Sequence, residues 1–119
     1  MKAVSVAASR QYDILIERGL LNRAGKLVRS VTNAGTVMLV SDDSVWPLYG
    51  ETVQKSLEDT GVSVCRFVFP HGEGSKCAKT YLALLDALCE NRLTRADAVV
   101  ALGGGVVGDL TGFAASTYL

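Results

Sequence analysis

Three consecutive glycines, Gly103, Gly104 and Gly105, are the residues with the most distinctive chemistry. They follow an apolar run and precede a second apolar segment with helical spacing. Glycine loses more conformational freedom on folding than any other residue, so three in succession indicate that something requires a bare backbone. The usual reason is a phosphate group that approaches the N–H groups at the start of a helix. The alternative is a tight strand-to-helix turn in which the glycines only allow close packing.

Gly103, Gly105 and Gly108 also fit the G-x-G-x-x-G pattern of dinucleotide-binding turns. The predicted context is suitable, with a strand before the pattern and a helix after it. Two features differ from an ordinary Rossmann fold, because the glycines follow the last strand, and the ribose-binding acid expected about 20 residues later would lie beyond the chain. We expect Asp109 in the first turn of the helix, where the dipole favours a carboxylate. Its alternative role is to bind a hydroxyl or the nicotinamide group of a dinucleotide.

A second polar segment, residues 70–76, follows another predicted strand. Ligands of open α/β sheets bind at the carboxyl ends of the strands. Glu73 could accept hydrogen bonds from ribose hydroxyls, and Lys76 could donate to a ribose oxygen or a phosphate. The alternative is a polar loop in which Glu73 or Ser75 caps the next helix. Asp42 ends a third strand, and here too a helix-capping role for Asp42 or Asp43 is the alternative to ligand binding.

The amino-acid composition argues against several classes of function. Twelve basic residues balance twelve acidic ones, which argues against a nucleic-acid-binding or membrane-binding surface. No apolar stretch approaches the roughly 20 residues of a membrane-spanning helix, and no signal peptide is recognisable, so we expect a cytoplasmic protein. The odd number of cysteines, Cys65, Cys77 and Cys89, favours reduced thiols. Their spacing and the single histidine, His71, predict no metal site in these residues.

Hydrophobic periodicity predicts the elements that position these residues. Residues 1–8 and 12–17 alternate as two strands of a hairpin, and residues 20–31 have helical spacing that Asn33-Ala34-Gly35 would end. Strands are predicted at 36–41, 62–69 and 98–102. Helices are predicted between them, one with an apolar stripe of Val45, Leu48, Tyr49, Val53 and Leu57 and one beginning at Ser75, and the last helix spans 106–119. The 119 residues therefore predict one α/β domain, a Rossmann-like and mostly parallel sheet flanked by helices, with an N-terminal β-hairpin.

Taken together, these segments resemble the 3-dehydroquinate synthase family over the whole chain. The resemblance is carried by Pro70, Gly72, Glu73 and Lys76 in a P-x-G-E-x-x-K pattern, by the segment 103–113 and by Tyr118. It implies a cofactor site for NAD in which Asp42 reaches the adenosine side, Glu73 and Lys76 hold the ribose region, the glycines face the pyrophosphate and Asp109 approaches the nicotinamide. The residues that the resemblance places around NAD are Asp42, His71, Gly72, Glu73, Gly74, Ser75, Lys76, Gly103, Gly104, Gly105, Val106, Val107, Gly108 and Asp109.

The family also has a C-terminal domain that carries the ligands of a divalent metal, zinc or cobalt, and the lysines and arginines that bind the heptulosonate phosphate substrate. No counterpart of these residues is present here, so we expect an N-terminal fragment with no catalytic or metal-binding residue and no activity alone. The resemblance further implies a homo-oligomer of the shikimate pathway. The helix 106–119 is apolar on nearly every side, so we expect a second domain to cover its outer face in the intact enzyme and that face to be exposed in this chain. Another sugar phosphate cyclase and a stand-alone nucleotide-binding or interaction module are the alternatives.

Overall fold

The computed structural model describes residues 1–119 and contains two separate sheets. Their elements follow one another along the chain as β1 (Lys2–Ala7), β2 (Gln11–Ile16), α1 (Ala24–Arg29), β3 (Thr36–Asp42), α2 (Glu51–Glu58), β4 (Ser63–Phe69), α3 (Ala78–Glu90), β5 (Ala98–Leu102) and α4 (Gly105–Tyr118). Strands β1 and β2 form an antiparallel hairpin, and the other three strands form a parallel sheet in the order β4-β3-β5. The predicted α/β fold class and hairpin are confirmed.

Strand β3 is the centre of the parallel sheet. It pairs with β4 from Thr36 to Asp42 and with β5 from Val37 to Ser41. Every residue of β3 after Thr36 is buried, which explains why its sequence is an almost continuous apolar run rather than an alternating one. Strands β4 and β5 lie at the two edges and are only partly buried.

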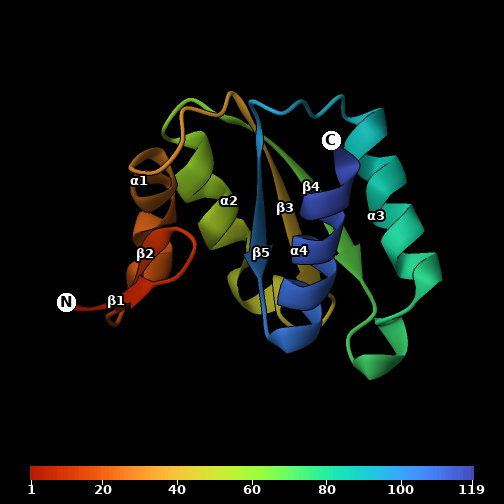
Figure 1. Ribbon diagram of the computed structural model, residues 1–119, viewed down its shortest axis with the longest axis horizontal. Helices are drawn as coiled ribbons and strands as arrows, with labels where there is room; N and C mark the ends of the chain where they lie inside the picture. Colours follow the sequence, from red (N-terminus) through yellow and green to blue (C-terminus); the bar gives the residue numbers. More distant parts are fainter.

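The alternating side chains of β3 divide the core into two layers, because successive residues of a strand point to opposite faces. Val37 and Leu39 pack with Val53 and Leu57 of α2 on one face. Met38 and Val40 pack on the other face with residues of α3 and α4, among them Leu84, Leu88, Val107 and Leu110. Figure 1 shows the sheet between the α1–α2 pair and the α3–α4 pair. The parallel sheet is thus covered by helices on both faces.

The N-terminal hairpin lies outside this three-layer arrangement (Figure 1). Its apolar side chains are largely exposed, including Val4, Tyr12, Ile14 and Ile16. Glu17, just after β2, pairs with Arg23 at 2.7 Å and with the N-terminal amine at 3.4 Å. Exposed ion pairs of this kind contribute little stability, so the hairpin is held mainly by its own backbone ladder.

Three predicted helices differ from the structure in their details. The segment 20–31 forms a 3₁₀ turn, Leu20–Arg23, and then the short α1, because the backbone of Arg23 leaves the helical region between them. The third helix begins at Ala78 rather than Ser75, because Lys76 has a non-helical backbone conformation. The segment before α2 forms a π-helical turn, Trp46–Gly50, which has more residues per turn than an α-helix. Leu48 and Tyr49 therefore leave the predicted apolar stripe and are 68% and 47% exposed.

Helix α4 is apolar on most of its surface but buries only one side. Val107, Leu110, Thr111 and Ala114 face the sheet and are buried, whereas Phe113 on the outer side is 56% exposed. This agrees with the expectation of an uncovered outer face. None of the helices has the length and apolar character needed to cross a membrane.

The contact between α1 and α2 depends on a residue without a side chain at Gly25. A Cβ atom at this position would lie 2.0 Å from the backbone oxygen of Ser56, and the N–H of Gly25 donates to Ser56 Oγ at 2.9 Å. We expect Gly25→Ala to lower the free energy of unfolding by about 2–3 kcal/mol, because backbone atoms must move apart.

Urea unfolding followed by far-UV circular dichroism measures this effect. The matched control is Gly112→Ala in α4, where an added Cβ would have no atom within 4 Å. That variant should gain roughly 0.5–1 kcal/mol from the better helix propensity of alanine. Equal stability of the two variants would show that α1 and α2 do not pack as closely as described.

Candidate functional site

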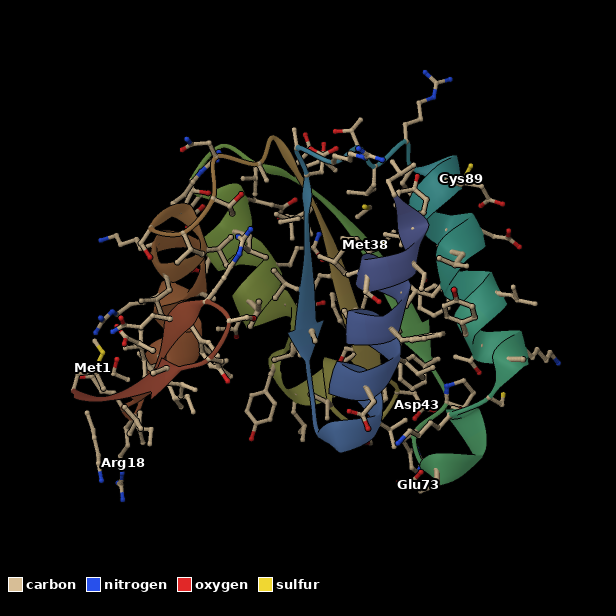
Figure 2. The ribbon with its side chains drawn as sticks, in the orientation of Figure 1. Met1, Arg18, Met38, Asp43, Glu73 and Cys89 are labelled. Carbon is tan, nitrogen blue, oxygen red and sulfur yellow. The ribbon has the colours of Figure 1, made fainter.

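The three polar segments singled out from the sequence lie at one edge of the sheet. Parallel strands place their carboxyl ends together, so Asp42 ends β3, residues 70–77 follow β4, and residues 103–109 follow β5. Figure 2 shows Asp43 and Glu73 at this end of the molecule, Met38 in the interior, and Cys89 at the opposite end of α3. The structure therefore brings the predicted site residues into one region.

Asp42 closes the turn that follows β3. Its Oδ1 accepts hydrogen bonds from the N–H groups of Ser44 and Val45, at 3.0 and 2.8 Å, and from the hydroxyl of Ser44 at 2.9 Å. Burial disfavours the ionised carboxylate, but these three hydrogen bonds outweigh it and hold the pKa of Asp42 below its ordinary value. Asp42 therefore closes a turn and does not cap a helix, because the helical segments that follow have Val45 and Gly50 as N-cap residues without a side-chain cap. The turn engages one of the two carboxylate oxygens of Asp42.

Asp43 joins the end of β3 to the segment that follows β4. Its N–H donates to Phe69 O at 2.9 Å, which continues the ladder one residue beyond the strand. Its Oδ1 accepts the N–H of His71 at 2.9 Å and contacts the ring Nδ1 of His71 at 2.5 Å. Asp43 had been considered only as a helix cap, and nothing in the local sequence indicated its pairing with His71, 28 residues away.

Each member of this pair changes the pKa of the other. The hydrogen bond from the His71 ring, followed by the bond from the His71 N–H, lowers the pKa of Asp43. The hydrogen bond to Asp43 and its negative charge raise the pKa of His71. Both side chains are more than half exposed, so the pair is open to solvent and to ionic screening.

Segment 70–77 folds into a compact loop on its own backbone. Ser75 N–H donates to Gly72 O at 3.1 Å and Lys76 N–H donates to Glu73 O at 3.0 Å, which makes one 3₁₀ turn. The hydroxyl of Ser75 donates to the carbonyl of Pro70 and ties the two ends of this turn together. Ser75 therefore stabilises the loop rather than capping α3, and the carboxylate of Glu73 remains exposed.

The three glycines do not share one structural role. Gly103 has φ +155°, and an added Cβ would lie 2.7 Å from Val107 Cγ2, so packing and backbone geometry both require glycine there. Gly104 and Gly105 have neither a positive φ nor any atom within 4 Å of an added Cβ. Close packing, the alternative explanation for the glycines, accounts for the first but not for the other two.

Gly104 and Gly105 lie where α4 begins. Gly104 is the N-cap residue, and no side chain caps the helix. The first N–H groups of a helix have no partner within it, so those of α4 are directed to the space beside the loop. A bare backbone, free N–H groups and the positive end of a helix dipole form an arrangement that binds anionic oxygens.

An ion pair connects the second and third segments. Lys76 Nζ lies 2.8 Å from Asp109 Oδ2, and this contact raises the pKa of Lys76. Asp109 is the fifth residue of α4, so the expectation that it lies in the first turn was wrong. Asp109 is thus one turn beyond the start of α4. Its side chain contacts Lys76 and does not lie at the positive, N-terminal end of the helix dipole.

A groove of about 300 Å³ extends from this ion pair along α3 and α4. It is lined by Lys76, Cys77, Ala78, Tyr81, Asp109, Leu110 and Phe113. The rings of Tyr81 and Phe113 lie 4.8 Å apart, and the hydroxyl of Tyr81 contacts Thr117 Oγ1 at 2.6 Å. Sequence analysis had not assigned Cys77, Tyr81 or Phe113 to the site, although their spacing of four from Cys77 to Tyr81 and from Asp109 to Phe113 places each pair on one helix face.

The cysteines do not form a metal site. All three are free thiols in the structure. No group of three or more His, Cys, Asp or Glu side chains could hold a metal ion. Hydrogen bonding to Thr80 lowers the pKa of the Cys77 thiol, whereas burial raises that of Cys65.

The sequence of this chain is similar to those of known proteins. Residues 66–119 match the family model described as the N-terminal part of 3-dehydroquinate synthase. The whole chain is 45% identical over 119 residues to the 3-dehydroquinate synthase of Streptococcus suis and covers 34% of that protein. The family resemblance drawn from the sequence motifs is confirmed, and the chain spans about a third of the length of the curated relatives it matches.

Solved structures show the same fold. A 2-deoxy-scyllo-inosose synthase, complexed with carbaglucose-6-phosphate, NAD+ and Co2+, superimposes with a TM-score of 0.83 at 21% identity, over 98% of this chain and 32% of that one. The 2-epi-5-epi-valiolone synthase of Streptomyces hygroscopicus, with NAD+ and Zn2+ bound, gives a TM-score of 0.76 at 30% identity, over 97% and 31% of the two chains. The fold is thus that of about a third of each of these two synthases.

The turn hydrogen bonds of Asp42 predict a pH-dependent contribution to stability. We expect Asp42→Ala to lower the free energy of unfolding at pH 7 by about 1 kcal/mol, because the turn loses hydrogen bonds to a charged group. Because the pKa of Asp42 is lowered in the folded state, this contribution is present above the unfolded pKa of about 3.9 and disappears as the pH falls through the folded value.

Urea denaturation at pH 7 and near pH 3 measures this difference. Asp86→Ala, which removes an exposed carboxylate from α3, is the matched control and should change stability by less than about 0.5 kcal/mol. A stability loss in Asp42→Ala that is as large near pH 3 as at pH 7 would contradict a contribution from the ionised carboxylate.

Proposed function

We propose that this chain is the N-terminal, NAD-binding part of a 3-dehydroquinate synthase. Identity of 45% to a named synthase across all 119 residues supports the proposal. In such an enzyme this part would bind NAD, while the remaining two-thirds of the protein would supply the groups that bind the heptulosonate phosphate substrate. The conversion of that substrate to 3-dehydroquinate and phosphate is accordingly proposed for the full-length protein.

The observation that carries NAD binding is the unexplained bare backbone at Gly104 and Gly105. The fold requires glycine at Gly103, but nothing in the chain itself requires it at the next two positions. A pyrophosphate approaching the free N–H groups of α4 would require both, because any side chain there would occupy the space of the phosphate oxygens. The same space is open in the structure, so the residues present fit the cofactor.

The other predicted contacts are arranged around this loop. Lys76 and Asp109 already meet at 2.8 Å, so bound NAD would either lie across their ion pair or replace part of it. The exposed carboxylate of Glu73 is free to accept ribose hydroxyls, and Asp42 retains one carboxylate oxygen for the adenosine side. His71, Gly72, Gly74 and Ser75 would contribute backbone, as would Val106, Val107 and Gly108 at the start of α4.

NAD, when bound, would supply the hydride acceptor for a transient oxidation of the substrate. The residues of this chain would bind and orient it: backbone N–H groups hold the pyrophosphate, Glu73 and Lys76 fix a ribose, and Asp109 faces the nicotinamide end. The chain does not fit the divalent metal, because no three potential ligands lie together. We derive no metal-dependent step from these residues and propose that the metal ligands belong to the other part of the enzyme.

Another sugar phosphate cyclase is the second candidate, since proteins with that activity share this fold. The substrate-binding residues that separate the two activities would come from the other part of the enzyme. We propose that this other part also packs against the exposed side of α4 around Phe113. The intact enzyme is proposed to be a homo-oligomer. A nucleotide-binding module without catalysis would need the same loop but no metal or substrate residues.

Substituting the second glycine tests the cofactor site directly. Gly104 has an extended backbone with φ −87° and ψ −158°, so it does not need the left-handed conformation reserved for glycine, and an added Cβ meets no atom within 4 Å. Gly104→Val should therefore fold normally but lose NAD binding in isothermal titration calorimetry. Gly112→Ala, outside the loop, is the control and should retain it. Unchanged affinity in Gly104→Val would exclude the glycine loop as the phosphate-binding site.

The 119-residue chain should have no synthase activity by itself, even with NAD and zinc added. The reason is that it contains no cluster of metal ligands. Phosphate release from the heptulosonate phosphate substrate is the measurement, with a full-length synthase as the positive control. Turnover at a comparable rate would overturn the division of roles proposed for the two parts of the enzyme.

A further inference from the structure

Segment 70–77 is held by one ion pair near each of its ends. At its start, the backbone N–H and the ring Nδ1 of His71 both contact Asp43 Oδ1, at 2.9 and 2.5 Å. At its end, Lys76 Nζ contacts Asp109 Oδ2 at 2.8 Å. Between these two points, the carboxylate of Glu73 is exposed and makes no hydrogen bond or ion pair with the rest of the protein. The two ion pairs, which we call the anchors, and the loop's own hydrogen bonds thus contribute to the position of Glu73.

The two anchors differ in their response to protons. The contact with Asp109 raises the pKa of Lys76, which is therefore charged throughout the neutral range, whereas a histidine changes its charge there. His71 is the only histidine of the chain. The charged groups that act on its ring are the carboxylates of Asp43 and Asp42, both at the end of β3. Within the loop itself the charged groups are Glu73 and Lys76, and Lys76 is directed to α4.

We propose that His71 and Asp43 form a proton-dependent clamp that holds segment 70–77 on the end of β3, and that His71 is thereby a positioning residue for the nucleotide site. The proposal rests on the proposed NAD-binding function. When His71 is protonated, its ring and Asp43 form an ion pair in addition to the backbone hydrogen bond. When His71 is neutral, the backbone hydrogen bond remains and an Nδ1–H tautomer can still donate to Asp43, but the charge of the ring is lost, so the segment stays folded and is held less firmly.

The contact between His71 and Asp43 determines how the clamp depends on pH. Because Asp43 raises the pKa of His71, the clamp is fully formed below the ordinary histidine pKa and weakens as the pH rises through the raised value. A loop already held in place costs less entropy to order around a ligand. NAD should therefore bind more tightly at about pH 6 than at about pH 8.5, by roughly two- to fivefold, the range of an exposed ion pair. NAD itself does not change its charge across this range.

The clamp is tested first without any ligand. Proton NMR follows the ring of His71 and the amides of Gly72, Glu73 and Gly74 between about pH 5.5 and pH 8.5. The loop amides should shift with the same midpoint as the His71 ring. In Asp43→Asn the His71 midpoint should fall towards its ordinary value and the amide shifts should lose most of their amplitude. Loop amides that do not follow His71 in the native chain would overturn the clamp.

Calorimetric titration with NAD at about pH 6 and pH 8.5 then tests the link to the site. The native chain and Asp86→Asn, which removes an equivalent exposed charge from α3, should show the two- to fivefold ratio of affinities. Asp43→Asn should show a ratio near one. A ratio in Asp43→Asn as large as in the native chain would contradict the clamp, since attraction between NAD and the His71 charge alone would then explain the effect. Absence of NAD binding at both pH values would count against the proposed function, and the NMR titration would still decide on the clamp.

Discussion

Burial of strand β3 on all sides is the constraint on which the rest of the structure depends. Its backbone is paired along both edges, and its side chains contact a different pair of helices on each face. Parallel pairing requires long crossovers between neighbouring strands, and the helices that provide these crossovers also cover the apolar faces. The same pairing places the carboxyl ends of β3, β4 and β5 side by side. The location of the candidate site is thus a consequence of how the core is built.

At that edge, charged side chains connect segments that the chain separates widely. Asp43 joins β3 to the loop after β4, and Lys76 joins this loop to α4. Each contact is exposed and individually weak, so neither accounts for the stability of the fold. Their effect is geometric, because they fix the loop that carries Glu73 relative to the glycines at the start of α4. A site assembled in this way can be adjusted by single protons or ligands without disturbing the core.

The elements and the site region could be predicted from the sequence where local patterns are strong. The apolar run of residues 36–41, the helical spacing of the segment after Ser75, and the glycines after β5 all have short-range signatures. Helix ends were less predictable. The backbones of Arg23 and Lys76 leave the helical conformation, and this depends on the loops to which the two residues belong. The pairing of His71 with Asp43 and the direction of the Asp109 side chain could not be predicted, since each depends on where a distant segment lies.

Strand β5 has an unpaired edge that affects how copies of this chain associate. Its sequence from Ala98 to Leu102 is entirely apolar, it carries no charge or proline, and it is paired only on the side of β3. Proteins commonly protect such edges with lysine, proline or a bulge, because an unpaired apolar strand is a template for intermolecular β-pairing. None of these protective features is present on β5. We therefore expect copies of the 119-residue chain to associate through this edge when its concentration is raised.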